Sequence, residues 1–247
     1  MFRGLWRLTW LEIKIFIREP MGVFGTVGVP VLMFLAASRV LGRRATAGAA
    51  LPALVADLPV VVSLFVAIGA VLSLVAIMAI YREGGILKRL RATPLRPHTI
   101  LTAHVLVKLL FSAVTLALMA MVGRRYNPGS ADAPLLSFGV AVLFSTACIS
   151  SLGFVIASVV PTARFAQPIG ALALYPMLAL SGLFVPLDAL PSAAQAVARV
   201  VPLTYAVSLL RGIWHGEGWI SHAGDVAVLA LVFVVCAAMS ARVFRWE

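Results

Sequence analysis

Long apolar runs dominate the sequence and limit the folds open to it. Six segments with few charged side chains lie at residues 21–41, 58–80, 99–122, 135–160, 168–187 and 225–243. An α-helix rises about 1.5 Å per residue, so about 20 residues cross a hydrocarbon core about 30 Å thick. The sequence therefore predicts an all-α polytopic membrane protein, with six transmembrane helices in a single transmembrane domain covering residues 1–247.

The composition agrees with a membrane protein and argues against a nucleic-acid binder. The chain is 62% hydrophobic and 12% charged, whereas soluble domains are about half apolar. Its 20 Lys and Arg exceed its 9 Asp and Glu, giving a net charge of +11. These basic residues flank the apolar runs, as is common beside membrane spans. No nucleic-acid partner is expected, and Cys148 and Cys236 are interpreted as small buried hydrophobic residues rather than a disulfide or metal ligands.

Residues 1–20 have the pattern of an amphipathic helix. Arg3, Arg7, Lys14 and Arg18 fall in one sector at helical spacing, and most apolar residues lie broadly opposite. This arrangement predicts an interfacial helix on the membrane surface. A plain basic anchor is the alternative. Because charges interrupt this segment, no cleavable signal peptide is expected and the N-terminus is predicted to be retained.

The segment 81–98, between the second and third apolar runs, is the densest cluster of charge. Its apolar residues Ile86, Leu87 and Leu90 recur at helical spacing, and its basic residues are Lys88, Arg89 and Arg91. The pattern predicts a short amphipathic helix that ends before Pro94, because proline disfavours helix at the preceding residue. The alternative is a juxtamembrane loop held by lipid headgroups.

The region 188–221 contains apolar pieces too short to cross a membrane, at residues 191–201 and 202–214. Ser192 and Gln195 have the spacing of a capping box, which favours a helix start there. Two half-length helices predict a re-entrant hairpin on one membrane face. An irregular surface loop is the alternative.

Six spans would place both termini, segment 81–98 and the turn 161–167 on one side. That side carries more Lys and Arg than the other, which predicts that it is cytoplasmic. The hairpin then faces outward.

The residues needed for catalysis or nucleotide binding are not found together in the sequence. The four histidines, His98, His104, His215 and His222, form no metal-binding spacing, so no metal site is expected. No G-x-x-x-x-G-K-[ST] loop is present, so we expect no enzyme activity and no cofactor bound by this chain. In the third apolar run, His104 and Lys108 are four residues apart, and snorkelling of Lys108 toward the surface is favoured over a functional role.

Two motifs are similar to those of the permease subunits of ABC-2 type ATP-binding-cassette exporters. Residues 82–95 read R-E-G-G-I-L-K-R-L-R-A-T-P-L and resemble the family's E-R-G-T-L-K-R-L-x-A-T-P-L loop after the second span. Residues 181–187, 190–191, 201–207 and 210–212 resemble its S-G-x-F-x-P, L-P and P-L-T-x-A-V-x-x-L-R-G pattern. One departure is Ala103-His104, where the family often has Gly-Lys, which puts a charge role there in doubt.

The resemblance implies roles for both motifs. Coupling to an ATPase would involve Glu83, Gly84, Gly85, Ile86, Leu87, Lys88, Arg89, Leu90, Arg91, Thr93 and Pro94. An outer gate would involve Phe184, Pro186, Pro191, Pro202, Thr204, Tyr205 and Arg211. The implied assembly contains two permeases, as a homodimer or heterodimer in membrane lipid, and two ATPase subunits that bind ATP and Mg²⁺.

The expected function is export of hydrophobic or amphipathic small molecules, such as drugs or antibiotics, across a prokaryotic cytoplasmic membrane. The spans carry few charges from which to build a hydrated ionic path. Phe34, Phe65 and Met78 are candidate path residues, with core packing as the alternative for each. The alternative cargo is a lipid or a lipid-linked glycan; outside transport, the alternatives are a membrane enzyme and a receptor.

Overall fold

The computed structural model describes residues 2–46, 58–84, 97–126, 134–160 and 162–243, and all regular elements in these ranges are helical. The elements are α1 (Phe2–Arg18), α2 (Pro20–Val23), η1 (Phe24–Gly28), α3 (Val29–Thr46), α5 (Leu58–Glu83), α7 (Pro97–Tyr126), α8 (Leu135–Val159), α9 (Ala163–Leu180), η3 (Leu187–Ala189), α10 (Ser192–Ala198), α11 (Pro202–Trp214) and α12 (Ala223–Val243).

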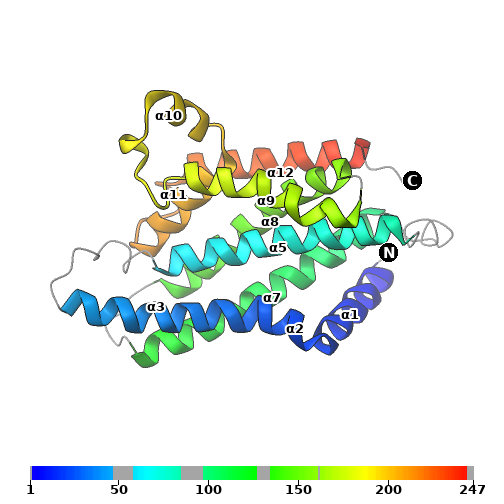
Figure 1. Ribbon diagram of the computed structural model, residues 1–247, viewed down its shortest axis with the longest axis horizontal. Coiled ribbons are helices and arrows are strands. Elements are labelled where there is room, and N and C mark those ends of the chain that lie inside the picture. Colours follow the sequence, from blue (N-terminus) through cyan, green and yellow to red (C-terminus); the bar gives the residue numbers. More distant parts are fainter. Residues whose placement is uncertain (1, 47–57, 85–96, 127–133, 161, 244–247) are drawn as a thin grey trace.

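The long helices form an elongated bundle with α8 near its centre. Helices α3, α5, α7, α8, α9 and α12 run roughly along the long axis of the molecule (Figure 1), and α8 contacts α5, α7, α9, α11 and α12. Helices α5 and α8 are apolar on all sides, which is typical of helices with no water-facing side. At Gly153 of α8, an added Cβ would lie 3.0 Å from Val71 and 3.1 Å from Leu74 of α5. The glycine therefore lets these two helices approach closely.

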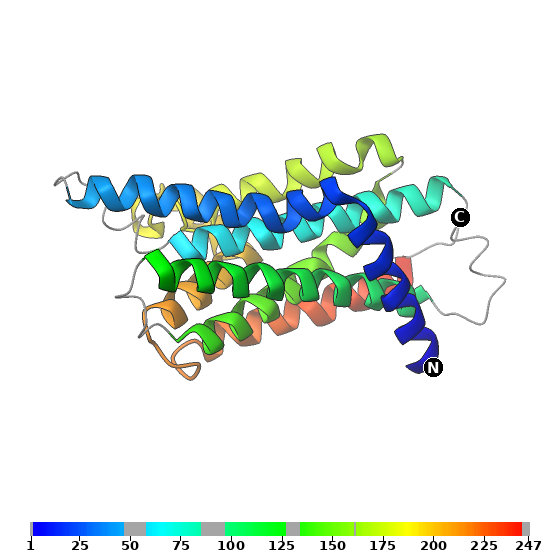
Figure 2. The ribbon, with the colours of Figure 1, turned by 90° about the horizontal axis from the view of Figure 1, so that it is seen from below.

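Both ends of the described chain lie at the same end of the bundle (Figures 1 and 2). We call this the terminal end; it also holds the end of α5 and the start of α7. Helices α10 and α11 lie toward the opposite end, which we call the hairpin end (Figure 1). This arrangement is the one predicted from six crossings, and the cytoplasmic location of the terminal end stays a prediction.

Four described helical stretches are long and apolar enough to span a membrane: Ser63–Tyr81, Thr102–Val122, Leu135–Ser158 and Ala223–Ser240. Two bent pairs meet the same condition when each pair is taken together, Gly4–Arg18 with Pro20–Ala36 and Ser192–Ala198 with Pro202–Trp214, which gives up to six. These findings confirm an all-α polytopic membrane protein.

The fifth predicted span, 168–187, differs from the helix observed there. Helix α9 has 18 residues, begins at Ala163 and ends at Leu180. It ends early because the chain turns at Ser181 and Gly182, and Gly182 has φ +81°, which side chains other than glycine rarely adopt. This helix is not among the four stretches above.

Helix α1 meets the first long segment at a bend of 93°. Its side chains Trp6, Trp10 and Ile17 are 60% to 70% exposed, and the basic residues Arg7 and Lys14 are exposed too. Apolar and basic groups on an exposed helix perpendicular to the spans are typical of an interfacial helix. Helix α1 also packs on α7, so it is part of the bundle as well.

Candidate functional site

Most of the predicted coupling segment lies outside the described residues, namely Gly85, Ile86, Leu87, Lys88, Arg89, Leu90, Arg91, Thr93 and Pro94. The described part is the end of α5. Glu83 is exposed, and the Gly84 amide donates to the Ile80 carbonyl at 2.8 Å, as in a continuing helix. Helix α5 therefore leads directly into the coupling segment, and α7 begins directly after it.

A polar cluster joins α1 to the two helices that flank the coupling segment. The Tyr81 hydroxyl of α5 donates to Glu12 Oε1 of α1 at 2.9 Å. On α7, His104 Nδ1 lies 3.5 Å from Glu12 Oε2, and its ring meets the Tyr81 ring edge-on at 5.4 Å between centroids. We call Glu12, Tyr81 and His104 the coupling-end cluster. Hydrogen bonds to a carboxylate are stronger than neutral ones, so the cluster links the three helices.

Lys108 lies one turn beyond His104 and is buried, so the snorkelling prediction is wrong. The residue is 5% exposed. Its Nζ lies 4.7 Å from the centroid of the Phe16 ring, and that ring packs on Phe111 with centroids 4.3 Å apart. The physical reason is that α1 folds onto α7 and covers the lysine, which the sequence pattern did not reveal.

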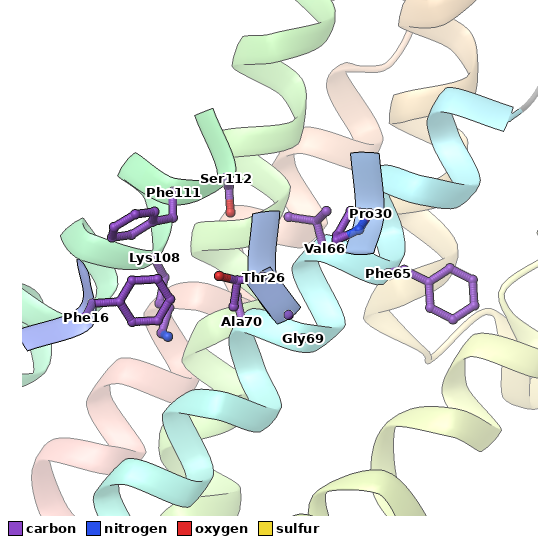
Figure 3. Close-up of a pocket in the computed structure, with 11 residues that line it drawn as sticks. Phe16, Thr26, Pro30, Phe65, Val66, Gly69, Ala70, Lys108, Phe111 and Ser112 are labelled. Atoms are coloured by element: carbon purple, nitrogen blue, oxygen red, sulfur yellow. The ribbon is translucent and has the colours of Figure 1, made fainter. Parts of the chain in front are cut away.

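Lys108 lines a cavity between α1, η1, α3, α5 and α7, drawn in Figure 3. The cavity has a volume of about 430 Å³, including the part open to the surroundings. Its lining residues are Phe16, Gly25, Thr26, Pro30, Phe65, Val66, Gly69, Ala70, Lys108, Phe111 and Ser112. The lining is thus mostly apolar, with a few polar groups, as in many small-molecule sites.

The three candidate path residues lie in different surroundings. Phe65 lines this cavity, is 38% exposed and points away from the other labelled side chains (Figure 3). Phe34 is buried against Met119 in a small separate cluster, and Met78 is buried in the main core. Phe34 and Met78 therefore have the surroundings expected of core-packing residues, which was the alternative to lining a substrate path.

At the hairpin end, the two halves of the predicted gate motif contact each other. The Arg211 guanidinium of α11 donates to the carbonyls of Gly182 and Leu183, each at 3.4 Å. These carbonyls belong to the turn that ends α9. The arginine therefore connects the S-G-L-F turn to α11, although the two are far apart in sequence.

Two further gate residues close the end of α10. Thr204 Oγ1 donates to the Ala198 carbonyl at 2.7 Å, and the Tyr205 hydroxyl donates to the Arg199 carbonyl at 2.6 Å. Carbonyls at the end of a helix lack partners within it. The side chains from the start of α11 therefore satisfy the end of α10 and fix the 82° bend between the two helices.

The predicted start of α10 was right, but the predicted capping box was not. The helix begins at Ser192, as expected, but its N-cap is Pro191 and no side chain caps it. Gln195 Nε2 instead donates to the Leu190 carbonyl at 2.9 Å. Phe184, Pro186 and Pro191 are exposed, whereas Pro202 is half-buried.

A histidine cluster between α11 and α12 was missed by sequence reasoning. His222 Nε2 lies 2.7 Å from Glu217 Oε2, and His222 Nδ1 lies 2.8 Å from Asp225 Oδ2. Asp225 Oδ2 also accepts from Ser208 Oγ at 2.8 Å. We call Glu217, His222 and Asp225 the outer histidine cluster. The signal in the sequence was acidic residues five before and three after a histidine, which is weak on its own.

Folding stability is expected to depend on pH through His222. Partial burial acts to lower its pKa, but hydrogen bonds and negative charge from Asp225 and Glu217 outweigh burial and raise the pKa above the usual 6.5. A raised pKa means that the folded state favours the proton, so this stabilisation is fully present below pH 6.5 and is lost as pH rises through the folded-state value. Thermal unfolding in detergent against pH should show this loss.

The matched control for the pH dependence is a second histidine. His222→Asn should remove that part of the pH dependence, while His215→Asn, at an exposed position in the same region, should retain it. An unchanged pH profile in His222→Asn would contradict the assignment.

The fold defines the class of the protein, an all-α polytopic membrane protein with a pair of short helices bent by 82° at one end. Comparison with known proteins names the family within that class. The family model for the ABC-2 type transporter matches residues 3–214, and the chain belongs to this family. It is thus a membrane component of a transporter.

Two relatives share part of this chain. Nodulation protein J of Rhizobium leguminosarum bv. trifolii is 30% identical over 96 residues, and Nodulation protein J of Rhizobium leguminosarum bv. viciae is 31% identical over 96 residues. In both cases the match covers 39% of this chain and 37% of the relative. The matched region thus spans little more than a third of either relative.

Proposed function

We propose that the chain is the permease subunit of an ATP-driven exporter that moves hydrophobic or amphipathic small molecules out across the cytoplasmic membrane. Two permeases, identical or different, would assemble with two ATPase subunits, which would bind ATP and Mg²⁺. Both termini would be cytoplasmic. Family membership supports the ATPase partnership, and the sequence contains no P-loop through which this chain could bind the nucleotide itself.

The observation that carries the proposal is the coupling-end cluster. Glu12 contacts both Tyr81, four residues before Gly85, and His104, eight residues after Arg96. A force applied by an ATPase to residues 85–96 would thus reach α5 and α7 together, with α1 tied to both. Because packed elements move as rigid units, the cluster supports the transfer of ATPase closure to the bundle.

The cavity between α1, η1, α3, α5 and α7 supports the proposed kind of cargo. Its walls are mainly aromatic and aliphatic side chains, with Thr26, Lys108 and Ser112 as polar groups. A lipid-linked glycan would need many more polar groups to satisfy its hydroxyls. A drug-like or lipid-like molecule fits this lining better.

A purified complex tests the ATPase partnership. Leu90→Asp places a charge at an expected apolar contact of the coupling segment and should reduce co-purification of the ATPase, with a loss of roughly 2–4 kcal/mol in interface free energy. Ile220→Asp is the matched control, because Ile220 is exposed near the hairpin end. The partnership would be contradicted if both variants retained the ATPase and cargo-stimulated ATP turnover equally. A glycan cargo would instead be indicated by a glycan that competes with drug-stimulated turnover.

A further inference from the structure

Lys108 lies at the buried end of the cavity without a polar partner. It is 5% exposed, and its Nζ forms no hydrogen bond within the described part of the chain. The same atom lies over the Phe16 ring, 4.7 Å from its centroid. Retaining an ammonium group in such a place is costly unless an anion pairs with it.

The acidic residues near Lys108 do not supply that anion. Glu12 and Glu19 act on it through space, but neither forms an ion pair with it. The Glu12 carboxylate is instead shared by Tyr81 and His104, and Glu19 is exposed at the end of α1. Among the described residues, Lys108 Nζ thus has neither a hydrogen-bond partner nor an ion-pair partner.

The cavity has an open mouth and a buried charged end. Gly25, Phe65 and Gly69 are exposed, whereas Val66, Lys108 and Ser112 are buried. A Cβ added at Gly25 or Gly69 would meet no atom within 4 Å, so both glycines border open space. Gly25 belongs to η1, a π-helical turn, and such turns are frequent at functional sites.

We propose that this cavity binds an amphipathic molecule with one acidic group, a carboxylate or a phosphate. The acid would pair with Lys108 Nζ, and the apolar body would lie along the apolar lining toward the mouth bordered by Gly25 and Gly69. The ligand would be a cargo molecule or an acidic membrane lipid, which share this chemistry. The cargo interpretation rests on the proposed export function, whereas binding itself does not.

Binding of a fluorescent fatty acid tests the proposal directly. The full chain is purified in neutral detergent and titrated with anthroyloxy-stearic acid and with its methyl ester, which differ only in the charged group. The wild type should bind the acid about tenfold more tightly than the ester, as expected for one buried ion pair. Lys108→Met should abolish this preference, and Lys108→Arg should keep most of it.

Two further variants distinguish binding in the cavity from general attraction of the acid to the positive charge of the protein. Lys14→Met removes an exposed lysine of α1 and should leave the preference unchanged. Gly69→Leu fills open space and should weaken binding of both acid and ester by at least about tenfold. Equal binding of acid and ester by the wild type, or an undiminished preference in Lys108→Met, would overturn the proposal.

If the wild-type protein prefers the acid, two further measurements show whether its natural ligand is a membrane lipid or a cargo molecule. Displacement of the probe by phosphatidylglycerol assigns the cavity to an acidic lipid, and transport of the fatty acid by vesicles containing the complete transporter assigns it to cargo. Either result supports an acidic amphiphile. Because the binding assay uses no ATPase, its failure would leave the proposed ATPase partnership untouched, and loss of that partnership would leave the binding result untouched.

Discussion

Replacing Gly212 with alanine is expected to destabilise the protein, although alanine is the better helix former. Gly212 is buried near the end of α11, and a Cβ at this position would coincide with the imidazole of His222. The imidazole would have to leave its place between Glu217 and Asp225. Overpacking and lost hydrogen bonds together cost roughly 2–4 kcal/mol, which exceeds the gain of about 1 kcal/mol in helix propensity. Thermal unfolding in detergent should show the loss.

Two controls make the Gly212 prediction specific to the contact with His222. In a His222→Ala background the obstacle is gone, so Gly212→Ala should then stabilise by about 0.5–1 kcal/mol. Gly139→Ala, in α8 where an added Cβ would meet nothing within 4 Å, should also be neutral or stabilising. If Gly212→Ala were equally harmful with and without the histidine, the contact would not be the cause.

Removing the Glu12 carboxylate is expected to uncouple the permease from the proposed ATPase. Glu12→Leu leaves the Tyr81 hydroxyl without its acceptor and removes the carboxylate beside His104, and a hydrogen bond to a charged group contributes about 1.5–3 kcal/mol. Helix α1 would then hold α5 and α7 less firmly beside the coupling segment. We expect cargo-stimulated ATP turnover by the complex to fall about tenfold or more, while basal turnover persists.

A double-mutant cycle separates coupling from general destabilisation. Glu12→Leu and Tyr81→Phe remove the two sides of one hydrogen bond, so their effects on stability should be non-additive by about 1 kcal/mol or more. Tyr175→Phe, at an exposed tyrosine of α9, is the matched control and should change neither stability nor turnover. Additive effects of the first two changes would show that their side chains act independently.

Periodicity and motif spacing were enough to predict the fold class and two half-length pieces at 191–201 and 202–214, where the structure has α10 (Ser192–Ala198) and α11 (Pro202–Trp214). Membrane helices satisfy their own backbone, so long apolar runs leave few alternatives. Residues of the gate motif also hold the structure together through hydrogen bonds, which the motif alone does not reveal. Arg211, Thr204 and Tyr205 each donate to a carbonyl at a turn or helix end.

The burial of Lys108 and the outer histidine cluster could not be predicted in the same way. Both depend on which helices pack together, since Phe16 covers Lys108 from α1 and Gly212 makes room for His222 from α11. The capping-box prediction was wrong for a related reason. Gln195 found the Leu190 carbonyl just before α10, and spacing within one helix does not reveal such competing partners.

The π-helical turn Phe24–Gly28 sets which side of the first long segment faces α7, while it changes the length of that segment very little. A π-helical turn holds about one residue more than an α-helical turn, and each α-helical residue turns the chain by about 100° for only about 1.5 Å of rise. Within the turn, the Thr26 carbonyl accepts from Thr115 of α7; beyond it, Phe34 meets Met119 of the same helix. Loss of one residue here would leave a segment that still spans the bilayer but presents the wrong side of α3 to α7. An insertion or deletion of one residue here would mainly rotate α3 about its axis. Packing against α7 therefore limits such changes more strongly than the thickness of the membrane does.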